Sequence, residues 1–188
     1  YFHNACDQIR VEAASLQFFS NNQFSNPMVV RIPGLGYQKG FGGHFHNDNS
    51  FAALRDIPGL IIACPSRGDD AVKMMRTLMA LAHVDKRVSV FLEPIALYMK
   101  KDLFAEGDNK WTFKYPKQDK FIPIGQGKVY NNKATDILII TYANGVSMSL
   151  EAISIFNKTH NETIAVMDLR WLQPLNKKSI CKLAANFD

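Results

Sequence analysis

Apolar residues follow two patterns along this chain, namely short continuous runs and stripes that repeat every three or four positions. The runs are rich in β-branched residues, as is typical of buried strands, and read MVVRIP, LIIAC, VSVFLE, DILIITY and TIAVMDL. Helices are predicted over residues 5–20, 49–57, 66–84 and 146–157 and in the segment after Asn176. Because strands and helices alternate, the pattern predicts an α/β fold with a parallel sheet flanked by helices.

Two polar residues stand where helices are predicted to begin. Ser66 precedes the longest stripe and has Asp69 three positions later, a spacing close to that of a capping box. Asn176 stands directly before the last predicted helix, KKSICKLAANF. We expect both residues to be N-caps. A nucleophilic role for Ser66 is disfavoured, because no histidine or acid is placed with it in the sequence.

The periodic pattern breaks between residues 99 and 133, where lysines and aromatic residues are mixed with turn residues. We interpret residues 1–98 as one domain, residues 99–133 as a linker or crossing segment, and residues 134–188 as the start of a second α/β lobe. Roughly 55 residues are too few for a complete α/β domain, so this lobe is predicted to be truncated. A start at Tyr1 without an initiator methionine also predicts a piece of a longer protein.

The composition is typical of a globular protein, with 47% hydrophobic and 21% charged residues and a net charge of +5 over 188 residues. No apolar run approaches the roughly 18 residues of a membrane span, and the first residues lack a basic start followed by an apolar core. We therefore predict a cytoplasmic protein without a membrane partner. Cys6, Cys64 and Cys181 are widely spaced, which argues against a disulfide framework or a zinc site.

Residues 34–50, GLGYQKGFGGHFHNDNS, combine five glycines with the histidines His44 and His46. Glycine at this density removes side-chain bulk, so the segment suits a loop that a ligand approaches closely. Imidazole exchanges protons near neutral pH. On chemistry alone an ordinary surface loop is the more common explanation for such a segment.

Five segments, in order, resemble the β-subunit of the thiamine diphosphate-dependent 2-oxoacid dehydrogenases: YFHNACDQIRVEAA, VVRIPGLG, GGHFHNDNSFAALRDIPGLIIACPS, FLEPIALY and MDLRWLQPLN. The resemblance covers nearly the whole chain. It implies a transketolase-like pyrimidine-binding domain followed by the start of the transketolase C-terminal domain. It also implies oxidative decarboxylation of a 2-oxoacid, such as pyruvate or a branched-chain 2-oxoacid, and acyl transfer to lipoyl.

The resemblance assigns site residues by position. His46 matches the histidine beside the thiazolium ring, and His44, two residues earlier, has at most a supporting role. Tyr1 falls where the family places an aromatic side chain against the aminopyrimidine ring. Asp85 takes the place of an aspartate that helps to hold a structural monovalent cation, although Arg87 replaces the nearby asparagine of that site.

The rest of the cofactor site is expected outside this chain. In the family, a separate domain with a GDG…N motif binds the diphosphate and its Mg²⁺, and no GDG triplet occurs here. The expected partners are therefore an α-subunit, or the N-terminal half of the same enzyme, and the lipoyl domain of the acyltransferase component, in a homodimer or heterotetramer. Phe51 replaces the family's glutamate, a departure that resembles versions with both subunits fused into one polypeptide.

Two alternatives remain open. Transketolase and deoxyxylulose-phosphate synthase share the implied architecture and would carry out ketol transfer. Residues 100–121 hold six lysines among aromatic residues, which is compatible with a nucleic-acid-binding module, but four acidic residues dilute the positive charge and we predict no nucleic-acid partner. Glu93, Asp168 and Arg170 stand at predicted strand ends, where a structural role is the more common one.

Overall fold

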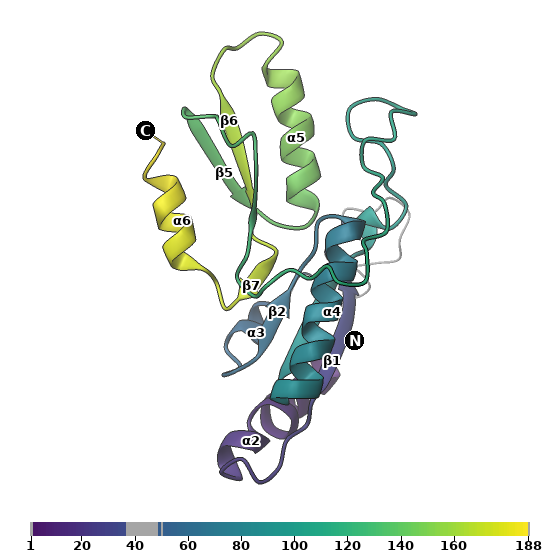
Figure 1. The fold of residues 1–188 in the computed structure, drawn as a ribbon, viewed down its shortest axis with the longest axis vertical. Coiled ribbons are helices and arrows are strands. Elements are labelled where there is room, and N and C mark those ends of the chain that lie inside the picture. Colours follow the sequence, from purple (N-terminus) through teal and green to yellow (C-terminus); the bar gives the residue numbers. More distant parts are fainter. Residues whose placement is uncertain (1, 37–48, 50, 188) are drawn as a thin grey trace.

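The computed structural model describes residues 2–36, 49 and 51–187, which form two sheets with helices around them (Figure 1). The first sheet has the strand order β1 (Met28–Gly34), β3 (Val88–Pro94), β2 (Ile61–Ala63) and β7 (Trp171–Gln173). Strands β1, β3 and β2 are parallel, and β7 is antiparallel to β2. The second sheet has the order β4 (Lys128–Tyr130), β6 (Ile164–Asp168) and β5 (Ile137–Thr141), in which β5 and β6 are parallel and β4 is antiparallel.

Helices cover both faces of the first sheet. Helix α4 (Gly68–Asp85) packs on one face, where Met74 and Leu78 meet Phe91 of β3 and Trp171 of β7. The opposite face is covered by Ile9 and Ala13 of the N-terminal helices and by residues around helix α3 (Ala52–Arg55). Successive residues of β2 and β3 therefore face different cores, which explains their continuous apolar runs. The predicted parallel α/β sheet is confirmed.

The second lobe contains two further helices, α5 (Asn144–Phe156) and α6 (Lys177–Ala184). Helix α5 packs on β5 and β6, and helix α6 follows β7 (Figure 1). The Asn176 side chain accepts a hydrogen bond from the Ser179 backbone N–H at 3.0 Å, so the predicted N-cap is confirmed. A 3₁₀ turn, η3 (Ile95–Leu97), follows β3.

The prediction of a single helix over residues 5–20 is wrong in detail. Residues 2–19 instead form a 3₁₀ turn η1 (Phe2–Ala5), helix α1 (Cys6–Gln8), a π-helical turn η2 (Ile9–Ala14) and helix α2 (Leu16–Phe19). The Ser15 hydroxyl donates to the Arg10 carbonyl, five residues earlier, which competes with the regular α-helical pattern. The apolar stripe still faces the core through Ile9 and Ala13.

The predicted N-cap of helix α4 is also wrong. The helix begins at Gly68, and Arg67, in an extended conformation, precedes it without a side-chain cap. The Ser66 side chain is buried instead, beside the carboxylate of Asp168. The serine side chain therefore lies beside Asp168 of the second lobe and does not cap the helix.

Within the part of the chain that the structure describes, no helix is both long and apolar enough to cross a membrane.

Candidate active site

The carboxyl ends of the parallel strands in the first sheet face the second lobe (Figure 1). This is the edge of an open α/β sheet at which ligands generally bind. After β2, the Cys64 backbone N–H donates to the Arg170 carbonyl of the second lobe at 2.7 Å. After β1, Leu35 adopts a left-handed φ of 58°, and the glycine-rich segment follows. The two lobes thus meet where the candidate site is expected.

The start of the glycine-rich segment and the residue directly after the segment both contact residues 142–144. The Asn144 side-chain amide donates to the carbonyls of Leu35 and Gly36, at 3.1 Å each. At the other end, the Phe51 ring packs edge-to-face against Tyr142, with 6.0 Å between ring centroids. The turn before α5 therefore holds both flanks of the segment in which the sequence places its histidines.

This turn is strained in a specific way. Ala143 has φ 52° and ψ −129°, a backbone conformation that residues other than glycine rarely adopt. A Cβ added at Gly145 would lie 2.0 Å from the Thr141 hydroxyl oxygen, so no side chain fits there. Such outliers persist where the surrounding structure imposes them, often near functional sites. The sequence analysis did not identify Asn144. The one indication of it in the sequence is its position shortly before the helix predicted after DILIITY.

Of the predicted site residues, Asp85 lies within the part of the chain that the structure describes. Tyr1, His44 and His46 lie outside the described residues. Asp85 is exposed at the last position of α4, and the Arg87 guanidinium donates to the Gly59 carbonyl at 3.0 Å. Among the described residues there is no group of three or more histidine, cysteine or acidic side chains that could hold a metal ion. The roles of Tyr1, His46 and Asp85 stay predictions.

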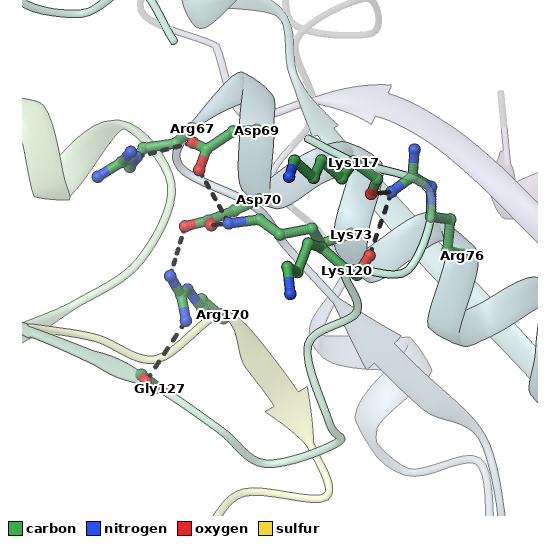
Figure 2. A network of polar contacts seen from close by, with 9 residues as sticks. All are labelled: Arg67, Asp69, Asp70, Lys73, Arg76, Lys117, Lys120, Gly127 and Arg170. Atoms are coloured by element: carbon green, nitrogen blue, oxygen red, sulfur yellow. Dashed lines mark hydrogen bonds and ion pairs between the residues drawn. The ribbon is translucent and has the colours of Figure 1, made fainter. Parts of the chain in front are cut away.

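A buried charged network joins the first turn of α4 to the second lobe (Figure 2). Asp70 is fully buried and forms ion pairs with Arg170 at 2.6 Å and with Lys73 at 2.7 Å. Lys73 also pairs with Asp69 at 2.8 Å. Arg170, 6% exposed, follows Asp168 in the loop between β6 and β7. Because Asp70 and Arg170 are buried, each of these two charges depends on its partners.

The same network holds the crossing segment. The Arg67 guanidinium pairs with Asp69 at 2.9 Å and lies over the Phe113 ring, 3.9 Å from its centroid. Arg76, further along α4, donates to the backbone carbonyls of Lys117 and Lys120 (Figure 2). Residues 113–120 of the crossing segment are therefore held against α4 by specific contacts, and the end of the segment forms β4 of the second sheet. The predicted boundaries at residues 98 and 134 stay predictions.

Asp168 lies in the same interior, at the end of β6. One of its carboxylate oxygens accepts the Arg170 backbone N–H at 3.1 Å. Burial raises the pKa of Asp168 to about 6, although the Ser66 hydroxyl and the Arg170 charge act in the opposite direction. Burial, together with the negative charge of Asp168, also raises the pKa of the Cys64 thiol.

We expect Asp168→Asn to change how stability depends on pH. The folded-state pKa of Asp168 lies above its unfolded value, so its favourable contribution is complete below about pH 4 and is lost as pH rises through about 6. The asparagine variant should therefore gain about 2–3 kcal/mol over the wild type between pH 4 and pH 7.5. Urea unfolding of both chains across this range measures the difference, and parallel pH curves would contradict it.

Glu93, at the end of β3, is paired within the fold. The Arg31 guanidinium binds both of its carboxylate oxygens, and the Tyr98 hydroxyl donates to one of them. Burial opposes ionisation, but the hydrogen bonds from Arg31 and Tyr98 outweigh it and lower the pKa of Glu93. These contacts favour the structural role expected for Glu93.

A groove of about 760 Å³ lies beside this pair, between α4 and the end of β3. Three arginines line it, and arginine is the residue type that an anion site would use. Arg31 is paired with Glu93, Arg67 with Asp69, and Arg76 with backbone carbonyls. The guanidinium groups that line the groove are thus already engaged by the fold.

Comparison with known proteins finds relatives in the family that the sequence motifs resemble. Residues 125–187 match the family model "Transketolase, C-terminal domain". The chain is 32% identical over 182 residues to the 2-oxoisovalerate dehydrogenase subunit beta of Bacillus subtilis, covering 96% of this chain and 50% of that protein. It is 30% identical over 178 residues to the mitochondrial pyruvate dehydrogenase E1 component subunit beta of Saccharomyces cerevisiae, covering 95% of this chain and 44% of that protein.

A solved structure shows the same fold. The chain resembles a split gene transketolase, described as an inactive beta4 tetramer, with a TM-score of 0.65 and 13% identity over 98% of this chain and 50% of that one. The chain therefore spans about half the length of the proteins it matches. Residues 125–187 match the transketolase C-terminal domain, and the chain as a whole is similar in sequence to β-subunits of 2-oxoacid dehydrogenases.

Proposed function

We propose that this chain is the β-subunit-like part of a thiamine diphosphate-dependent 2-oxoacid dehydrogenase, which decarboxylates a 2-oxoacid and transfers the acyl group to lipoyl. The observation that carries the proposal is the 32% identity to a 2-oxoisovalerate dehydrogenase β-subunit over 96% of the chain. The geometry supports it, because the glycine-rich segment begins at the carboxyl edge of the parallel sheet, where α/β proteins bind ligands.

The proposal gives two residues of this chain a place beside the cofactor. Tyr1 would stack on the aminopyrimidine ring, and His46 would lie beside the thiazolium ring and move a proton there at its imidazole nitrogen. When bound, thiamine diphosphate supplies the carbon that attacks the 2-oxoacid. In this proposal, the glycines near His46 in the sequence would leave room for a ring, a substrate and a lipoyl arm to approach.

The diphosphate and Mg²⁺ belong to another polypeptide in this proposal. An α-subunit, or an N-terminal half of the same enzyme, would provide their ligands, and the lipoyl domain of the acyltransferase component would accept the acyl group. We propose a homodimer or heterotetramer as the assembly, and we expect residues 1–188 alone to be inactive. A monovalent cation at Asp85 and a cytoplasmic location stay predictions.

The alternative functions have less support. Ketol transfer, as in transketolase, shares the fold, but the similarity to a transketolase structure is 13% identity and shows the fold alone. In residues 100–121, Trp111 is buried, and Asp102 and Asp108 accept backbone amides of the same segment. This segment is therefore built into the fold, and similarity to dehydrogenase β-subunits favours the main proposal over a nucleic-acid-binding module.

The substrate class is tested with the full-length enzyme and its partner polypeptide, supplied with thiamine diphosphate and Mg²⁺. We expect pyruvate or a branched-chain 2-oxoacid to be decarboxylated and to acylate an added lipoyl domain. Xylulose 5-phosphate, with a ribose 5-phosphate acceptor, is the matched comparison. Turnover of the sugar phosphates without turnover of any 2-oxoacid would replace this proposal with ketol transfer.

A further inference from the structure

Directly after β1, a side chain of the second lobe makes a buried polar contact with the first lobe. Asn144, the first residue of α5, is 8% exposed and places its amide nitrogen 3.1 Å from the carbonyl oxygens of both Leu35 and Gly36. The contact joins residues more than 100 positions apart in the sequence. It therefore depends on how the second lobe packs on the first.

These two carbonyls need a donor that the sheet does not supply. Strand β1 ends at Gly34, and Leu35 turns away with φ 58°, so the regular β1–β3 ladder stops there. Buried carbonyls without a partner are costly. One amide group with two N–H bonds can satisfy both acceptors at once and so fix the direction in which the chain leaves the strand.

The turn that presents Asn144 contains a strained backbone conformation at Ala143. Ala143 is held at φ 52° and ψ −129°, and Gly145 packs against Thr141 where no Cβ fits. The Ser147 hydroxyl donates to the Asn144 carbonyl at 3.2 Å, which holds the first turn of α5. An unstrained turn would be more stable, so the strain indicates that the direction of the Asn144 side chain matters.

We propose that Asn144 is a positioning residue for the reaction proposed above. Its amide fixes the backbone of Leu35 and Gly36, from which the chain continues into the glycine-rich residues that precede His46 in the sequence. The inference rests on the proposed function for its effect on catalysis. Its structural part, that Asn144 holds the end of β1, does not depend on which reaction the enzyme performs.

Variants of Asn144 in the full-length enzyme with its partner polypeptide test the inference. Asn144→Ala should lower kcat by about 10²-fold with a smaller change in the KM of the 2-oxoacid, because misplacing a reacting group by about 1 Å has an effect of this size. Asn144→Gln keeps both amide donors on a longer arm and should recover part of the loss. Asn144→Asp replaces the donors with a carboxylate facing two carbonyls and should recover none.

Asn176→Ala is the matched control, since Asn176 also donates its amide to a backbone carbonyl, that of Gly125, and caps a helix away from the end of β1. Hydrogen exchange should be faster over residues 28–36 in Asn144→Ala and unchanged there in Asn176→Ala. Equal kcat values in the two alanine variants, or unchanged exchange over residues 28–36 in Asn144→Ala, would overturn the inference. If the wild-type enzyme has no 2-oxoacid activity, the proposed function fails, and the exchange comparison alone decides whether Asn144 positions this backbone.

Discussion

Replacing His46 with alanine in the full-length enzyme is expected to lower acyl transfer by about 10²- to 10⁴-fold, the usual contribution of a general acid or base. Cofactor binding and folding should be nearly unchanged, because the proposed role of His46 is proton transfer beside the thiazolium ring and not the holding of the diphosphate. Overall transfer to a lipoyl domain and calorimetric binding of thiamine diphosphate with Mg²⁺ measure the two effects separately.

His44→Ala is the control for this prediction. It removes an imidazole from the same glycine-rich segment, two residues from His46. Like His46→Ala, it leaves the length of the segment and its glycines unchanged. We expect it to lower acyl transfer far less than His46→Ala. Full activity of His46→Ala would remove His46 from the mechanism, whereas equal losses in both variants would indicate that the segment acts through its shape.

The elements that could be predicted from the sequence are those whose signals are local. Strand β3 is fully buried on both faces, so its apolar run is unbroken, and α4 has a helical stripe that begins within two residues of the predicted start. The cap at Asn176 needs only a side chain and an amide three residues away. In each case the interactions that define the element lie within a few positions of one another.

The elements that could not be predicted depend on distant partners. Strand β7 is three residues long and exists because it pairs with β2, more than 100 residues earlier. Strand β4 is equally short and pairs with β6. Asn144 resembles any polar residue at a helix start, and only the packed structure shows that its amide reaches Leu35 and Gly36. The periodicity of apolar residues reports local structure and does not indicate contacts between distant residues.

Arg170→Met is expected to destabilise the 188-residue chain by about 3–5 kcal/mol, the usual effect of removing one partner from a buried ion pair. Methionine keeps much of the apolar volume of the side chain, so the main loss is the charge. Asp70 is fully buried and, among the described residues, would keep Lys73 as its ion-pair partner. The Gly127 carbonyl would lose its hydrogen bond from Arg170, at 3.5 Å, as well (Figure 2).

Arg55→Met is the matched control for this prediction. Arg55 pairs with Asp56 at 3.5 Å, but both side chains are more than 70% exposed. Exposed pairs of this kind contribute about 0–1 kcal/mol, because water solvates either charge when the other is removed. Urea unfolding of the wild type, Arg170→Met and Arg55→Met at one protein concentration therefore separates the effect of a buried ion pair from the effect of losing any arginine. Equal stabilities for Arg170→Met and Arg55→Met would contradict a buried, interdependent network.

The double variant Asp70→Leu with Arg170→Met tests the physical reason for the loss. If the cost of Arg170→Met comes from the carboxylate left buried, then removing that carboxylate should restore part of the stability. Lys73 limits the recovery, since it would lose Asp70 and keep Asp69. We therefore expect the double variant to be more stable than Arg170→Met and less stable than the wild type. A double variant less stable than Arg170→Met would show instead that the two side chains hold the lobes together through separate contacts.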